Sequence, residues 1–236
     1  MIQYTLIRSN RKTAALCIRD GMVEVRAPLW VPKQDIDRFV AEKEQWILEN
    51  VEKQHNHAAK KESFKVDYGS VVTLRDKEYP IVKREGKDFC MAQAMQKSKH
   101  AGFDEEVLYM PPGLTPEQIK ATCIKLYRSC ANVHITSRVS AFGARMNLAP
   151  SVVKISNATR RWGSCSSKKS LNFSWRLIMA DDDVIDYVVV HELAHLVEMN
   201  HSKRFWAVVA AVLPDYKARQ ARLKHLYKKL SNEDWG

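Results

Sequence analysis

Two histidines one helical turn apart, His191 and His195, constrain the fold of this chain more than any other feature of its sequence. They are the first and last residues of the segment HELAH, which follows an acidic start and a run of valines. Acidic residues favour the positive end of a helix, so we expect a buried helix that Asp182 or Asp183 caps. Residues four apart on a helix share a face, so both imidazoles can bind one metal ion.

A third ligand is available six residues after His195, at His201. Asn200 tolerates a left-handed backbone, so we expect the chain to leave the helix there and to return His201 to the metal. Ser202 is then expected to cap the next helix. Three imidazoles with the fourth position open to water are typical of a catalytic rather than a structural zinc site.

Glu192 stands directly after the first ligand, where its carboxylate can reach water that the metal activates. The metal would polarise a scissile carbonyl, while Glu192 would take a proton from the water and pass it to the leaving amine. The segment therefore predicts a metal-dependent hydrolase, a zinc peptidase with one zinc ion per chain. Nickel and cobalt are alternative ions, because three imidazoles also bind them.

Two alternatives to a peptidase stay open on the sequence. The same metal, water and Glu192 could hydrolyse a non-peptide amide or ester, and only substrate profiling separates these two activities. The chain could instead be a nucleic-acid-associated protein with a structural or vestigial metal site. The presence of Glu192 argues against this function, because a purely structural site has no use for a general base.

The rest of the sequence predicts an α+β protein, with a mostly β amino-terminal part at residues 1–110 and a helical domain with the metal site at residues 111–236. A helical pattern with Ile36 and Val40 on one face begins at Gln34. Alternating apolar and polar residues predict short strands in the first part. The predicted strands are residues 2–8, 14–18, 22–27, 70–74, 79–83, 88–91 and 107–110, with a hairpin turn at residues 84–87.

The prolines and glycine at residues 111–113 mark the clearest boundary in the chain. Beyond them, Thr115 and Gln118 have the spacing of a capping box, so a helix is predicted to begin there and to extend to Met146. Two further strands are predicted at residues 152–156 and 171–179, separated by a loop.

The charge of the chain is concentrated in its second half. The sequence has 38 Lys and Arg against 27 Asp and Glu, a net charge of +11. Residues 111–236 hold 19 of the basic and 10 of the acidic residues, a net charge of +9. Clustered Lys and Arg can release counterions from phosphate, so nucleic acid is a candidate partner of this half beside a peptide or protein substrate. The alternative is a solvated basic surface.

The sequence gives no sign of a membrane or secreted protein. It has no basic stretch followed by an apolar run at its start, and no run of 18 apolar residues. Its five cysteines form no CxxC pair, which favours reduced thiols over a disulfide framework. We therefore expect a cytoplasmic protein, and the sequence leaves the oligomeric state open.

Several sequence blocks resemble the YgjP-like metallopeptidases, a group related to the SprT-like zinc proteases. The most specific are RWGSC at Arg161–Cys165, HELAHL at His191–Leu196, and the segments NHS and FW within residues 200–206. With the amino-terminal strands, the resemblance covers nearly the whole chain. It implies a zincin-type catalytic domain at residues 111–236, with the three histidines as zinc ligands and Glu192 as the general base.

Residues for substrate contact are expected near the strand at residues 171–179. Arg161 and Trp162 precede it and Trp175 lies in it, so these three are candidate substrate-binding residues, with packing as the alternative. The segment 171–175 is also a candidate edge for pairing with an extended peptide. Candidates to stabilise an oxyanion are Arg161, Tyr216 and His225.

The last predicted helix, residues 215–230, alternates basic and apolar residues. One face is expected to pack on the catalytic domain. The other face would be a basic stripe, either solvated or able to hold DNA or RNA. The basic residues of the stripe are Lys217, Arg219, Arg222, Lys224, Lys228 and Lys229.

Overall fold

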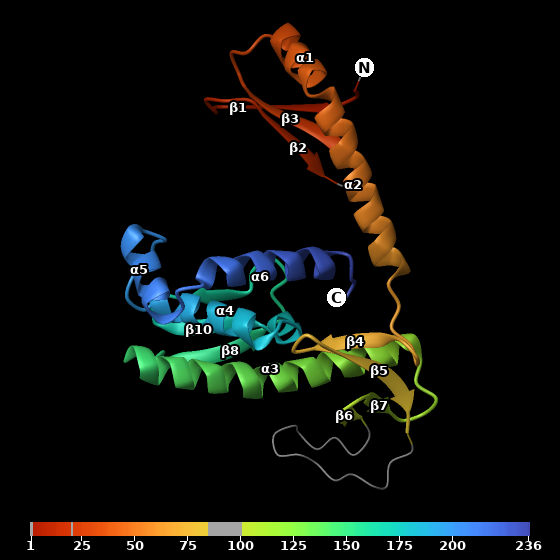
Figure 1. The fold of residues 1–236 in the computed structure, drawn as a ribbon. Coiled ribbons are helices and arrows are strands. Elements are labelled where there is room, and N and C mark those ends of the chain that lie inside the picture. The colour runs from red at the N-terminus through yellow and green to blue at the C-terminus, as the bar shows by residue number, and fades with distance from the viewer. Residues whose placement is uncertain (1, 20, 85–100) are drawn as a thin grey trace. The chain divides into compact units, whose positions relative to one another are not determined.

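The structure is a computed structural model that describes residues 2–19, 21–84 and 101–236 (Figure 1). The chain forms two compact units, Met1–Phe64 with residues 229–234 and 236, and Lys65–Lys228 with Trp235. Strands dominate the start and helices the rest, which confirms the predicted α+β class. Every helix among the described residues is too short or too polar to serve as a membrane span.

The first unit is a small sheet covered by helices. β3 is its middle strand, parallel to β1 and antiparallel to β2. Alternate residues of β3, among them Val23, Val25 and Ala27, are buried with Ile36 and Val40 from the first helix. This burial is the physical basis of the alternation in the sequence. The elements are β1 (Thr5–Ser9), β2 (Ala15–Arg19), β3 (Met22–Pro28), α1 (Lys33–Glu42) and α2 (Glu44–Ser63).

The second unit begins with a sheet of strand order β4-β5-β7-β6. Its members are β4 (Val71–Leu74), β5 (Lys77–Lys83), β6 (Gly102–Phe103) and β7 (Leu108–Met110). The strand predicted at residues 88–91 and the turn at residues 85–87 lie outside the described residues. The domain boundary predicted after residue 110 falls at the end of β7, within the second unit, and it stays a prediction.

Helix α3 (Pro116–Met146) starts where the capping box predicts. The Thr115 hydroxyl accepts a hydrogen bond from the backbone N–H of Gln118 at 3.3 Å, and the Gln118 side chain accepts one from the N–H of Thr115 at 2.9 Å. The helix ends at Asn147, whose left-handed backbone (φ 54°) terminates it.

A second sheet in this unit has β10 (Ser170–Ser174) in the middle, parallel to β8 (Val152–Ser156) and antiparallel to β9 (Gly163–Cys165). The prediction that residues 171–175 form a free edge is therefore wrong, because β10 has a partner on each side. The strand predicted to extend to residue 179 instead gives way to a 3₁₀ turn at Trp175–Met179. β8 and β9 are the two edge strands of this sheet among the described residues, and each pairs with β10 on one side only.

Helices complete the second unit. They are α4 (Asp182–Ala194), α5 (Lys203–Val212) and α6 (Tyr216–Ser231). Figure 1 shows α4 along the long helix α3, and α4 also packs against α5 and β9, so most of its surface is covered. This explains why α4 has no polar face: Val188, Val189 and Val190 are all buried. The β-branched run is compatible with a helix here because tertiary burial outweighs its weak helix propensity.

Candidate metal centre

The start of α4 is fixed by side-chain contacts. Asp181 is the N-cap, because its carboxylate accepts a hydrogen bond from the N–H of Val184 at 3.0 Å. The prediction of Asp182 or Asp183 as the cap is wrong by one residue. Asp182 instead pairs with Arg75 and lies 3.0 Å from His134 Nε2.

Helix α4 is held against α3 by an ion pair. Asp186 is only 7% exposed, and both of its carboxylate oxygens accept hydrogen bonds from Arg138 of α3, at 2.5 and 2.6 Å. Asp186 lies five residues before His191 on the same helix. The ion pair therefore fixes the position of α4 relative to α3, and with it the position of the histidines.

The chain leaves α4 earlier than the sequence predicts. The last helical residue is Ala194 and His195 is the C-cap, so the exit at Asn200 is wrong. A tight turn forms because the N–H groups of Val197 and Glu198 both donate to the carbonyl of Ala194, each at 3.0 Å. Asn200 has no left-handed backbone, since the carbonyl contacts of this turn already reverse the chain.

The next helix begins as predicted. Ser202 is the N-cap of α5, and its hydroxyl accepts a hydrogen bond from the N–H of Phe205 at 3.3 Å. The turn and the cap together bring His201 back beside α4.

The three predicted histidines lie together. One ring nitrogen each of His191, His195 and His201 falls within 4.8 Å of the others, and Nε2 of His201 is 3.0 Å from Nε2 of His191. Tetrahedral zinc with three imidazole ligands needs nitrogens about 3.3 Å apart, given Zn–N bonds of about 2.0–2.1 Å. The cluster therefore suits a divalent ion with small side-chain adjustments.

The surroundings of His191 and His195 favour the neutral imidazole, which is the form that binds a metal. Burial, followed by repulsion from the other two histidines, lowers the pKa of His191 to about 3. Burial also lowers the pKa of His195. Nδ1 of His195 lies 3.0 Å from the carbonyl of Glu198, and donation there leaves Nε2 available as a ligand.

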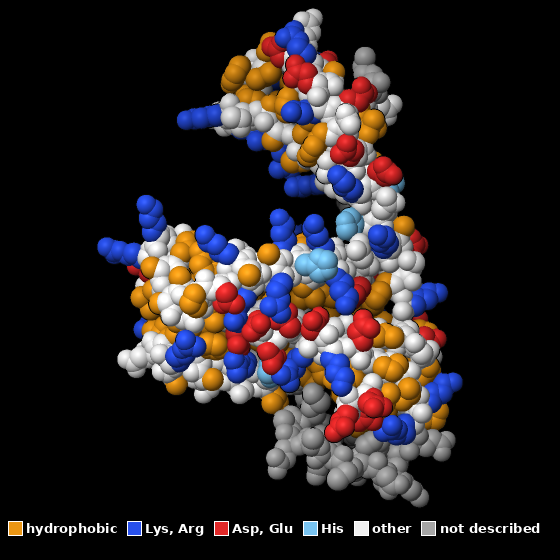
Figure 2. All heavy atoms as spheres, in the orientation of Figure 1, with side chains coloured by type: hydrophobic (Ala, Val, Ile, Leu, Met, Phe, Trp, Pro, Cys, Tyr) orange, Lys and Arg blue, Asp and Glu red, His pale blue; other side chains and the backbone are white. Residues whose placement is uncertain are grey.

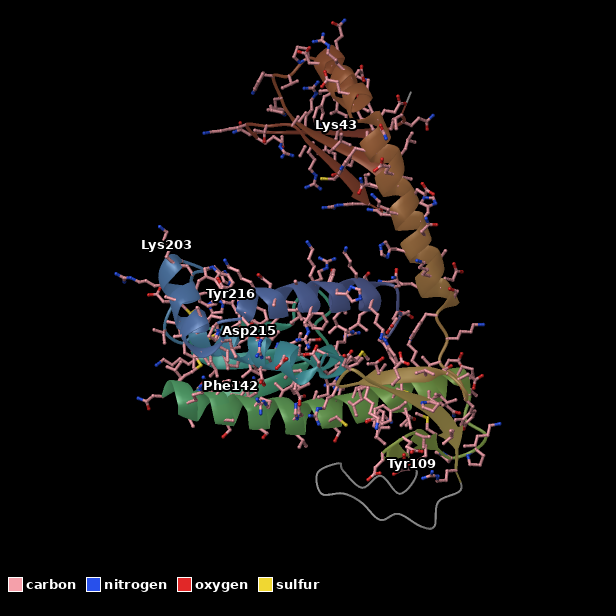
Figure 3. The ribbon with its side chains drawn as sticks, in the orientation of Figure 1. Lys43, Tyr109, Phe142, Lys203, Asp215 and Tyr216 are labelled. Carbon is pink, nitrogen blue, oxygen red and sulfur yellow. The ribbon has the colours of Figure 1, made fainter. Side chains whose placement is uncertain are left out.

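Aromatic rings enclose the cluster. Phe205 packs against all three histidines, with ring centroids 4.5–4.8 Å away. Trp206 stacks on His201 at 5.8 Å and on Tyr216 at 5.2 Å. Figure 3 shows Tyr216 at the start of α6, beside α5. These rings limit the access of water to one side of the cluster.

Glu192 is buried next to this cluster, with 5% of its surface exposed. Its Oε2 and the Nδ1 of His191 are buried without a hydrogen-bond partner among the described residues. Burial raises the pKa of Glu192 to about 7, while the charge of Arg161 acts in the opposite direction. An unpaired carboxyl with a pKa near neutrality can accept a proton and release it again.

This buried carboxyl predicts a pH-dependent effect of Glu192→Gln on the metal-free protein. The folded pKa of about 7 lies above the ordinary 4.5, so ionisation of Glu192 destabilises the folded state as pH rises from 4.5 through 7. Glutamine removes that penalty and should raise the free energy of unfolding at pH 8 by at most about 3 kcal/mol, with little effect at pH 4.5. Urea unfolding with a chelator at both pH values tests this, and an equal effect at both would contradict it.

Gly163 of β9 lies directly against the side chain of Glu192. The sequence alone did not indicate this contact. A Cβ atom at residue 163 would lie 2.5–2.6 Å from Cγ and Cδ of Glu192 and closer still to Oε1. The backbone of Gly163 does not have a positive φ, so its conformation does not require glycine. Glycine is required because any larger residue would overlap the Glu192 side chain. The only sequence signal was the position of this glycine within the RWGSC block.

We expect Gly163→Ala to displace the Glu192 carboxyl and lower kcat for hydrolysis by at least about tenfold, since small errors in the position of a reacting group are costly. The bound metal should stay unchanged because residue 163 packs on Glu192 and not on a histidine. Steady-state kinetics with metal analysis test this, with Ser164→Ala as the control on the same strand. Equal kinetics for the two variants would show that Gly163 does not position Glu192.

The predicted substrate-contact residues fall in different surroundings. Arg161 is exposed, and its charge acts on Glu192. Trp162 is half-buried, with its ring 6.5 Å from that of Tyr227. Trp175 is a core residue at 1% exposure that stacks on Tyr127, so its prediction as a substrate contact is wrong. The sequence could not show this, because the 3₁₀ turn points the indole inward.

Of the oxyanion candidates, Tyr216 packs on Trp206 beside the histidines. His225 is exposed on α6, without a hydrogen bond or ion pair to any described residue. Cys165 ends β9, and burial followed by the charge of Glu192 raises the pKa of its thiol. The thiol is therefore protonated at neutral pH and is a weak ligand.

The three histidines, of which His201 is exposed, thus lie together beside a buried carboxyl without a partner among the described residues. The family model described as "YgjP-like, metallopeptidase domain" matches residues 12–226. The chain belongs to this YgjP-like family, and this confirms the resemblance in the sequence. No curated protein shows significant similarity to the chain.

Two solved structures are similar to part of the chain. The metallopeptidase zymogen abylysin of Pyrococcus abyssi has 19% identity and a TM-score of 0.37, over 42% of this chain and 97% of its own. The metallopeptidase zymogen jannalysin of Methanocaldococcus jannaschii has 22% identity and a TM-score of 0.35, over 40% of this chain and 95% of its own.

Proposed function

We propose that the chain is a zinc-dependent peptidase in which His191, His195 and His201 hold the ion and Glu192 is the general base. The observation that carries this proposal is the cluster of three imidazoles beside a buried carboxyl without a partner among the described residues. Membership of a metallopeptidase family supports it. A cytoplasmic location stays a prediction from the sequence.

Glu192 is suited to the proton transfers of amide hydrolysis. Bound zinc supplies Lewis acidity that polarises the scissile carbonyl and makes water more acidic. Glu192 takes the proton of the attacking water and delivers it to the leaving amine. Tyr216 and Arg161 are the candidates to bind the developing oxyanion.

We infer that the substrate is an extended polypeptide that adds to the free edge of β9. No further strand pairs with that edge among the described residues, and an extended peptide can add to such an edge. Because Gly163 of β9 touches Glu192, a strand paired there carries its carbonyls past the general base. This replaces the pairing that the sequence predicted at residues 171–175.

The test is hydrolysis of a mixture of defined peptides by the zinc-loaded protein, followed by mass spectrometry. We expect new termini from internal peptide bonds, loss of cleavage with a chelator, and its return with added zinc. Cleavage of amide and ester reporters without any peptide cleavage would favour the non-peptide hydrolase instead.

A further inference from the structure

An open groove lies in the second unit between Trp162 and helix α6, with a volume of about 510 Å³. Trp162 and Tyr227 line it and contact each other edge to face, with ring centroids 6.5 Å apart, and Leu223 adds apolar surface. Lys217 and Lys224 also line the groove. The groove thus combines an apolar, aromatic lining with two cationic side chains.

The two lysines differ from the other basic residues of α6. Both are exposed and make no hydrogen bond or ion pair with any described residue. Arg219 pairs with Asp183 and Asp215, and Arg222 with Asp181 and Asp183, so their charges are neutralised. Figure 2 shows basic and acidic side chains side by side in this region.

These ion pairs lower the number of uncompensated positive charges in the basic stripe that the sequence predicted on α6. Arg219 and Arg222 stabilise the start of α4 and are not available to an anionic partner. The unneutralised charge that remains at the groove is that of Lys217 and Lys224. Two isolated cations are few for a phosphate backbone, which proteins bind with several Lys and Arg contacts.

The groove adjoins the candidate metal centre at two places. Trp162 directly precedes Gly163, which lies against Glu192. The carbonyl of Trp162 accepts a hydrogen bond from the N–H of Ser174 at 2.8 Å. Lys217 directly follows Tyr216, which stacks on Trp206. A strand rises about 3.3 Å per residue, so a chain paired with β9 reaches Trp162 within about three residues of the reacting bond.

We propose that this groove is a specificity subsite that binds acidic side chains of the polypeptide substrate. The proposal rests on the proposed peptidase function and names its substrate class. Carboxylates complement Lys217 and Lys224, while the aliphatic part of the same substrate residues packs on Trp162 and Tyr227. Nucleic acid is the competing occupant.

The test measures binding without hydrolysis, using the zinc-loaded full-length Glu192→Gln protein. The probes are two fluorescein-labelled twelve-residue peptides, one with adjacent glutamates and a matched one with glutamines. We expect the glutamate peptide to bind about three- to tenfold more tightly at low salt, with the preference shrinking at high salt. Adding Lys217→Ala and Lys224→Ala should reduce the preference to about one.

The matched control adds Lys125→Ala and Lys154→Ala, which remove the same charge from exposed positions on α3 and β8. It should keep the preference, and unfolding temperatures verify that both variants fold. An unchanged preference without Lys217 and Lys224 overturns the proposal. So does an unlabelled duplex DNA that binds more tightly than the glutamate peptide and depends on the same lysines.

Hydrolysis by the parent protein separates this proposal from the proposed function. Cleavage of both peptides at equal rates with equal affinity refutes the subsite and leaves the peptidase. A preference for the glutamate peptide that depends on Lys217 and Lys224, without cleavage of any peptide, supports the subsite as a binding surface and refutes the peptidase.

Discussion

Replacement of Glu192 by glutamine is expected to lower kcat for peptide hydrolysis by about 10²–10⁴-fold while the protein stays folded and keeps its metal. Glutamine has the shape of glutamate, so it fits the space beside Gly163. It cannot accept the proton of the attacking water. The three histidines are untouched, so the metal content should equal that of the native protein.

Glu106→Gln is the matched control, because Glu106 is an exposed residue of the same unit. It should leave kcat and KM as they are. The measurement is steady-state kinetics on a peptide that the native protein cleaves. A kcat of Glu192→Gln within threefold of native would mean that another group accepts the proton.

Loss of the Arg138 side chain is expected to cost about 2–4 kcal/mol of unfolding free energy. Arg138→Met leaves the Asp186 carboxylate almost buried without its cation, and an uncompensated buried charge is costly. Arg138 itself is about one-third exposed, which places the cost below that of a fully buried pair. Because Asp186 precedes His191 on α4, zinc should also bind more weakly. Urea unfolding and zinc titration measure the two effects.

The double variant Arg138→Met with Asp186→Asn separates charge from packing. It removes both charges and should recover at least half of the lost stability. If Arg138→Met alone unfolds at the same urea concentration as the native protein, the pair does not hold α4 against α3. If the double variant is no better than the single one, the loss comes from packing of the arginine on Phe142.

Much of the site followed from local sequence, because its parts are close in the chain. His191, Glu192 and His195 share one helix, and Ser202 caps the next as its spacing predicts. The exact cap and the exit of α4 were wrong. They depend on which neighbouring aspartate meets a backbone N–H and on carbonyl contacts within a turn.

Long-range contacts could not be predicted from the sequence. Arg138 and Asp186 are 48 residues apart, and no pattern in either helix shows that they meet. Glycine is required at residue 163 because the side chain of Glu192 occupies the space of a Cβ atom. The two residues are far apart in the sequence and meet only in the folded state. The sequence predicted Trp175 as a substrate contact, but it lies in a 3₁₀ turn and stacks on Tyr127 in the core.

The measurement that tests the central claim most directly is the metal content of three proteins after zinc loading and removal of excess ion. We predict about one zinc per chain in the native protein and in Glu192→Gln, and far less in His201→Ala, because two histidines alone hold the ion weakly. Full retention of zinc by His201→Ala would contradict the three-histidine site. A native protein that binds no zinc would contradict the peptidase itself.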